Sequence, residues 1–154
     1  MKRYFEKNVY DATQERLEFI FDNFDNIYVS FSGGKDSGLL LNLVLDYKRR
    51  HKIARKIGVF HQDFESQYQL TSDYVARMFE NNMRDIEPYW VCLPMGSRCA
   101  VSNFQMYWYP WDEDMKDAWV RPMPKMPYII NLENNPFDFY QLKMPQEDLY
   151  EEFG

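Results

Sequence analysis

The hexapeptide Ser32–Ser37, with the sequence SGGKDS, brings together the groups that bind phosphate in proteins. Its two glycines remove Cβ atoms, so the backbone can approach an anion closely and adopt a positive φ. The hydroxyl groups of Ser32 and Ser37 can donate hydrogen bonds to phosphate oxygens, and Lys35 supplies a point charge. An ordinary glycine-rich surface turn is the alternative interpretation. The combination of groups within six residues predicts a cradle for a polyphosphate.

Two better-known phosphate-binding loops do not fit this spacing. A Walker A loop has glycine where this chain has Val29, and serine or threonine after the lysine, where this chain has Asp36. The GxGxxG pattern of dinucleotide-binding proteins is not matched either. The hexapeptide instead resembles the PP-loop signature of the ATP pyrophosphatases.

The segments on either side predict the elements that would position the hexapeptide. A β-rich run precedes it, and apolar residues at helical spacing follow it. At such a turn the free N–H groups of the helix start point outward, with the positive end of the helix dipole behind them. The expected elements are a helix over 11–24 with Asp11 and Gln14 as its N-cap pair, a strand over 27–31, a helix whose apolar stripe is Leu39, Leu40, Leu43, Val44 and Tyr47, a strand over 57–60, a helix capped by Ser66 and Gln69, and a strand over 89–93.

Strands separated by helices predict parallel pairing through right-handed crossovers. The expected fold class is therefore α/β, an open parallel sheet with flanking helices. One domain is expected over residues 1–154, because the chain has no room for two full cores. It divides into a core over about 8–95 and an irregular, aromatic and proline-rich C-terminal extension over 96–154. The aromatic residues, 18% of the chain, indicate either core packing or a surface for a partner or a flat ligand.

Composition excludes several classes of function. The net charge of -6 disfavours non-specific binding to nucleic acid. The one dense basic run, residues 48–52, falls where a helix should end, so contact with the helix dipole explains it. Two cysteines spaced C-x6-C cannot hold an iron–sulfur cluster within this chain or form a zinc site with the histidines. No apolar run is long enough for a membrane span or a signal peptide, and the expected compartment is the cytoplasm.

Several stretches together resemble the phosphoadenosine phosphosulfate (PAPS) reductase family. Besides the hexapeptide and the strand before it, they are the segments 8–12 and 14–24, DFESQY after the second strand, YWVCLP in the third, and WVR at 119–121. The resemblance covers essentially the whole chain and is nearest to PAPS-reductase-like proteins of the immunoglobulin-binding regulator A type. It implies an adenine nucleotide α-hydrolase-like fold whose PP-loop holds the phosphates of ATP, or the phosphosulfate of PAPS, at the carboxyl edge of the sheet.

The candidate site residues follow from this placement. Asp63 and Glu65 come after the second strand at the same edge, where they and Asp36 could bind Mg²⁺ together with the phosphates. A solvated loop or a carboxylate at a helix start is the alternative for both. Arg98 and Arg121 could complete an anion clamp from the aromatic extension, or they are surface or packing arginines. The phosphate-binding candidates are Ser30, Ser32, Gly33, Gly34, Lys35, Asp36, Ser37, Arg98 and Arg121, with Lys35 and Asp36 as catalytic candidates.

The chain departs from the reductases of the family in its cysteines. Those enzymes end in a nucleophilic cysteine within a Glu-Cys-Gly-like motif, and no cysteine follows Cys99 here. Cys92, in a predicted strand, is expected to be an inert core thiol. The intact hexapeptide resembles instead the members that cleave ATP between the α- and β-phosphates. The expected function is adenylyl transfer or related sulfonucleotide chemistry; the alternative is an inactive nucleotide-binding regulatory module that acts with a partner chain or oligomer.

Overall fold

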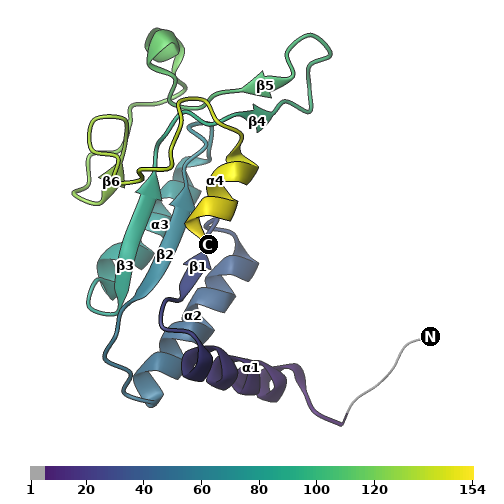
Figure 1. Ribbon diagram of the computed structural model, residues 1–154, viewed down its shortest axis with the longest axis vertical. Helices are drawn as coiled ribbons and strands as arrows, with labels where there is room; N and C mark the ends of the chain where they lie inside the picture. Colours follow the sequence, from purple (N-terminus) through teal and green to yellow (C-terminus); the bar gives the residue numbers. More distant parts are fainter. Residues whose placement is uncertain (1–5) are drawn as a thin grey trace.

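The computed structural model describes residues 6–154 as a mixed α/β fold, a parallel four-stranded sheet flanked by helices (Figure 1). The strands lie in the order β1-β2-β3-β6, and every neighbouring pair is parallel, which confirms the expected sheet type. The elements are α1 (Val9–Asn23), β1 (Tyr28–Ser30), α2 (Lys35–Arg50), β2 (Ile57–Gln62), α3 (Gln69–Asn82), β3 (Ile86–Val91), β4 (Ser97–Arg98), β5 (Tyr107–Trp108), the 3₁₀ helix η1 (Glu113–Ala118), β6 (Ile129–Ile130) and α4 (Gln146–Phe153).

The sheet separates two apolar cores because successive side chains of a strand point to opposite faces. Val29, Val59 and Trp90 belong to the core shared with α1, α2 and α3. Phe60 and Val91 belong to the second core, which α4 covers. Figure 1 shows α4 in front of the strands and α2 and α3 behind them. The connections leave the carboxyl ends of β1, β2 and β3 at one edge, and the hexapeptide follows β1 there.

The helix after the hexapeptide, α2, buries the expected stripe only in part: Val44 and Tyr47 are in the core, but its first two leucines are not. Leu39 and Leu40 are 61% and 46% exposed. The sheet side of α2 instead contains Gly38, where an added Cβ would lie 2.6 Å from the hydroxyl oxygen of Tyr74 in α3. The absence of a side chain at Gly38 thus allows Tyr74 of α3 to approach α2 closely. The buried residues are Gly38, Leu41, Val44, Leu45, Tyr47 and Lys48.

The expected helix caps are wrong in two places. α1 begins earlier than expected because Asn8 caps it, its side-chain oxygen accepting a hydrogen bond from the Asp11 N–H at 2.9 Å. Asp11 and Gln14 therefore lie inside the helix. The cap expected at Ser66 does not form either, since α3 follows Tyr68 without a side-chain cap.

The basic run ends α2 as expected, with Arg50 as the last helical residue. Lys48 Nζ and Arg49 donate to the two carboxylate oxygens of Asp85 at 2.8 and 2.7 Å. These bonds lower the pKa of Asp85 below its ordinary value. They tie the end of α2 to the turn before β3.

The region after β3 contains more regular structure than expected. It supplies the fourth strand, β6, whose two residues are too few to show an alternating pattern. It also supplies α4, the helix that covers the second face of the sheet. β4 and β5 form an antiparallel hairpin, and irregular segments connect the remaining pieces. Within residues 6–154 no helix combines the length and apolar character needed to cross a membrane.

Candidate functional site

The SGGKDS loop, residues Ser32–Ser37, forms a tight turn from β1 into α2. Gly33 has a φ of +79°, in the left-handed region that glycine adopts without strain. Inside the turn, the Ser32 hydroxyl oxygen accepts a hydrogen bond from the Gly34 N–H at 3.3 Å and lies 3.0 Å from the Ser37 hydroxyl. Ser37 also donates to the Gly34 carbonyl oxygen at 3.1 Å. The loop is thus held in shape by its own polar groups.

The first turn of α2 presents unused donors to solvent. The first helical hydrogen bond runs from the Gly38 N–H to the Gly34 carbonyl at 2.9 Å, so the N–H groups of residues 35–37 have no acceptor within the helix. No side chain caps this 16-residue helix. Lys35 and Asp36 are exposed, and neither takes part in an ion pair among residues 6–154. An anion here would meet free N–H groups, the helix dipole and an unpaired ammonium group.

The loop rests on the start of α3. A Cβ added to Gly33 would lie 2.8 Å from the Cγ2 atoms of both Thr71 and Val75. Glycine is therefore required here for space as well as for its φ. Thr71 and Val75 belong to no motif, so no sequence pattern indicates that α3 supports the loop.

A buried histidine lies under the base of the loop. His61, near the end of β2, is fully buried, and its Nδ1 lies 2.7 Å from the carbonyl oxygen of Phe31, the residue before the loop. A carbonyl oxygen can only accept, so Nδ1 carries the proton. Nε2 has no hydrogen-bond partner within residues 6–154. Burial lowers the pKa of His61, so the ring is neutral at pH 7 and braces the strand that carries the loop.

The two carboxylates predicted after the second strand lie at the expected edge but are not open to a ligand. Asp63 is fully buried, and Glu65 is 4% exposed. Asp63 accepts hydrogen bonds from the indole N–H of Trp90 and from Arg121, and Glu65 accepts from the backbone N–H groups of Trp111 and Val120. Their oxygens are already bonded to the protein, so this pair does not fit Mg²⁺, whereas the exposed Asp36 remains free. No group of three or more His, Cys, Asp or Glu side chains in residues 6–154 is arranged to hold a metal.

The two predicted anion-clamp arginines lie in different environments. Arg121 is held by Asp63 at 2.5 Å and lies over the ring of Trp111, 5.0 Å from its centroid. Arg98 is exposed on β4, in a hollow of about 480 Å³ that it shares with Cys99 and Phe104 and with no residue of the SGGKDS loop. Arg121 is thus already paired within the chain, and Arg98 shares its hollow with other residues of the hairpin.

The remaining sequence-predicted residues are placed as follows. Ser30 is the exposed last residue of β1, directly before the loop. Cys92 is buried just after β3, and burial raises the pKa of its thiol well above the ordinary value, which agrees with an inert core thiol. Cys99 is half-buried in the hairpin.

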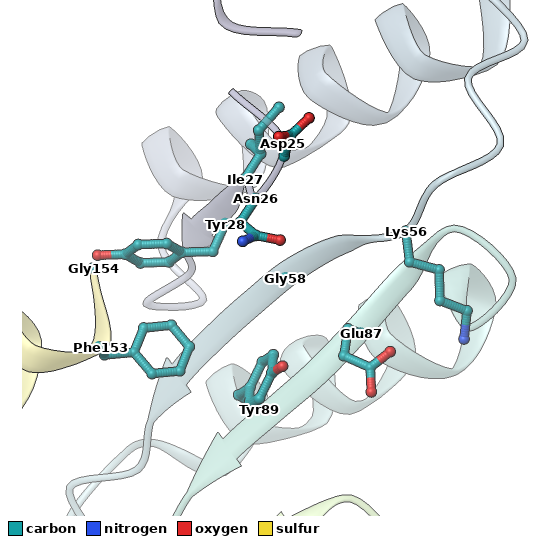
Figure 2. Close-up of a pocket in the computed structure, with 10 residues that line it drawn as sticks. All are labelled: Asp25, Asn26, Ile27, Tyr28, Lys56, Gly58, Glu87, Tyr89, Phe153 and Gly154. Atoms are coloured by element: carbon teal, nitrogen blue, oxygen red, sulfur yellow. The ribbon is translucent and has the colours of Figure 1, made fainter. Parts of the chain in front are cut away.

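A hollow of about 520 Å³ lies away from the loop, at the amino ends of the strands. Figure 2 shows Tyr28, Tyr89 and Phe153 around Gly58 on the sheet face that carries α4. The hollow is wide and open, and it has no helix N-terminus aimed into it. We therefore place the candidate site at the SGGKDS loop, where unused donors gather.

Comparison with known proteins identifies a relative but no family. The chain is 35% identical over 148 residues to "Uncharacterized protein YbdN" of Escherichia coli (strain K12). The match takes in 96% of this chain but 35% of the relative, so the chain spans about a third of the length of the curated relative it matches. No family model matches the chain, and no solved structure matches it.

Proposed function

We propose that this protein binds an adenine nucleotide, ATP or PAPS, with the SGGKDS loop acting as a PP-loop. The observation that carries the proposal is the uncapped first turn of α2, with free N–H groups at residues 35–37 and an unpaired Lys35. This turn follows β1 at the carboxyl edge of a parallel sheet, where open α/β proteins bind ligands. The resemblance of the hexapeptide and its flanking stretches to the PAPS reductase family supports an adenine nucleotide α-hydrolase-like assignment.

The reaction that we propose is transfer of the adenylyl group of ATP to an acceptor, with release of pyrophosphate. Catalysis is positional and electrostatic: the N–H groups and Lys35 hold phosphate oxygens in line and stabilise the charge that develops on the leaving pyrophosphate. Asp36, the one free predicted carboxylate, fits a magnesium ion shared with the phosphates, which would neutralise part of their charge. Reduction of a sulfonucleotide is not proposed, because Cys92 is buried in the core and Cys99 lines a hollow that contains no residue of the loop.

Isothermal titration with ATP and with PAPS tests the binding. Removing one charge-assisted contact costs about 1.5–3 kcal/mol, so Lys35→Ala should weaken binding roughly 10- to 100-fold. Lys56→Ala is the matched control, since Lys56 lies at the amino ends of the strands and should leave affinity unchanged. Equal affinity of wild type and Lys35→Ala for both nucleotides would contradict the proposal.

Pyrophosphate release distinguishes an enzyme from a regulatory module. Turnover of ATP that disappears in both Lys35→Ala and Asp36→Ala supports adenylyl transfer. Tight binding without turnover favours the regulatory module. In that case the missing reaction would require a partner chain.

A further inference from the structure

The two acidic residues after β2 use their acceptors on other parts of the chain. Asp63 Oδ1 accepts from the Glu65 N–H at 2.8 Å and from Arg121 at 2.5 Å, and Oδ2 accepts from the Trp90 indole at 2.8 Å. Glu65 Oε1 and Oε2 accept from the backbone N–H groups of Val120 and Trp111 at 2.8 and 3.0 Å. Each of the four carboxylate oxygens therefore has a donor.

The backbone of the same residues completes the connection. The Asp63 carbonyl accepts from the Trp111 indole at 2.8 Å, and the Glu65 carbonyl accepts from Arg121 Nε at 2.8 Å. Three of these donors, Trp111, Val120 and Arg121, are separated from the acceptors by 46 to 58 positions in the sequence. The contacts thus tie the extension to the carboxyl ends of β2 and β3.

The backbone conformation of two residues in the clasp indicates that surrounding contacts hold it in place. Glu65 and Trp111 have φ values of 63° and 57°, in the left-handed region that bulky residues rarely adopt. Such conformations persist where surrounding contacts over-determine them. Here the hydrogen bonds join the two strained residues to each other.

We propose that Asp63 and Glu65 are positioning residues that clasp residues 111–121 over the carboxyl ends of β2 and β3, and that they are not metal ligands. A magnesium ion at this pair would have to displace donors that include the fully buried Trp111 and the half-buried guanidinium of Arg121, and the displaced donors would lose their partners. The clasp also neutralises Arg121, which removes this arginine from the anion-binding groups. The clasp is inferred from the hydrogen bonds and burial of its residues. Only the expectation that Asp63 and Glu65 do not bind the Mg²⁺ of a nucleotide rests on the proposed function.

Hydrogen exchange of the protein without nucleotide tests the clasp directly. Glu65→Gln replaces one of the two acceptors with a donor, which then faces a backbone N–H. Amides of residues 111–121 should exchange at least 10-fold faster, while those of β2 change little. Asp117→Asn, an exposed change within the clasped segment, is the matched control and should leave exchange unaltered. Unchanged exchange in Glu65→Gln would overturn the proposal.

The response of the protein to Mg²⁺ distinguishes a clasp from a metal site. We expect Mg²⁺ alone to shift the melting temperature of wild type and Glu65→Gln equally. Where nucleotide binds, its Mg²⁺ dependence should be lost in Asp36→Asn and kept in Glu65→Gln. Loss of the Mg²⁺ response in Glu65→Gln, even with faster exchange, would show that the carboxylate is a ligand and overturn the proposal.

A change on the donor side keeps the test valid if Glu65→Gln fails to fold. Arg121→Lys retains the charge but cannot reach both Asp63 and the Glu65 carbonyl with a planar fork. It should also accelerate exchange over residues 111–121 without altering the Mg²⁺ response, and normal exchange would count against the clasp. If no nucleotide binds at all, the proposed function fails while the exchange result still decides the clasp.

Discussion

The SGGKDS loop and the Asp63–Glu65 clasp lie at the carboxyl ends of neighbouring strands and use polar groups in opposite ways. The loop is exposed, and within residues 6–154 the N–H groups of residues 35–37 have no acceptor in the helix and Lys35 has no ion-pair partner. The two carboxylates of the clasp are buried, and each of their oxygens has a donor. Polar residues after a strand therefore do not by themselves indicate a ligand site. Such residues are free to bind a ligand only where distant parts of the chain do not supply their hydrogen-bond partners.

The largest expected difference between the two regions is in stability. Asp63→Ala leaves Arg121 and the Trp90 indole without their acceptor in the interior, and breaking a buried ion pair on one side costs about 3–5 kcal/mol. Lys35→Ala removes an exposed side chain without a partner and should change the free energy of unfolding by less than about 0.5 kcal/mol. Urea denaturation of both variants measures the contrast. Similar losses of stability in the two variants would contradict the expected difference between the loop and the clasp.

A smaller effect is expected where the loop meets α3. Gly33→Ala puts a Cβ 2.8 Å from two methyl carbons and forces a positive φ on alanine, which together should cost about 1–3 kcal/mol. Thr71→Ser removes one of the two methyl groups, so the double variant should recover part of the loss. Gly34→Ala is the control, since its Cβ would meet only the Ser32 hydroxyl at 3.4 Å. Thermal denaturation of the four proteins shows whether the loop depends on α3.

The smallest effect concerns pH. Burial lowers the pKa of His61, so below the unfolded value near 6.5 the unfolded chain binds a proton that the folded chain does not. Stability should therefore fall as the pH drops from about 6.5 toward the folded pKa. His61→Asn keeps a donor near Nδ1 and should flatten this part of the profile. Asp85, whose pKa is also lowered, contributes to acid sensitivity only near and below pH 4, so denaturation curves between pH 7 and 5 isolate the histidine.

The sequence predicts the order of the first six elements and the parallel sheet because each element carries its own signal. Strand β1 and the two glycines mark the loop, and short-range patterns suffice there. β6 and α4 are not predicted from the sequence. β6 consists of two isoleucines, which are too few to show a periodicity, and α4 is only eight residues long. Their positions depend on pairing with β3 and on packing against the second face.

Short-range sequence patterns predict only part of the candidate site. The loop residues are contiguous, so their residue types alone indicate phosphate binding. The roles of Asp63 and Arg121 depend on a contact across 58 positions, which no local pattern reveals. Acidic residues after a strand look alike whether they face solvent or a buried guanidinium, and the fold alone separates the two cases.

The division into two cores has a consequence for how the chain is made. Residues up to Ile130 contain the whole sheet and the helices that cover its first face. Phe60 and Val91 on the second face gain their cover only with residues 137–153. If the sheet forms during synthesis before residues 137–153 are available, its second face exposes an apolar surface. Chaperones that recognise apolar surfaces would bind the chain at that stage.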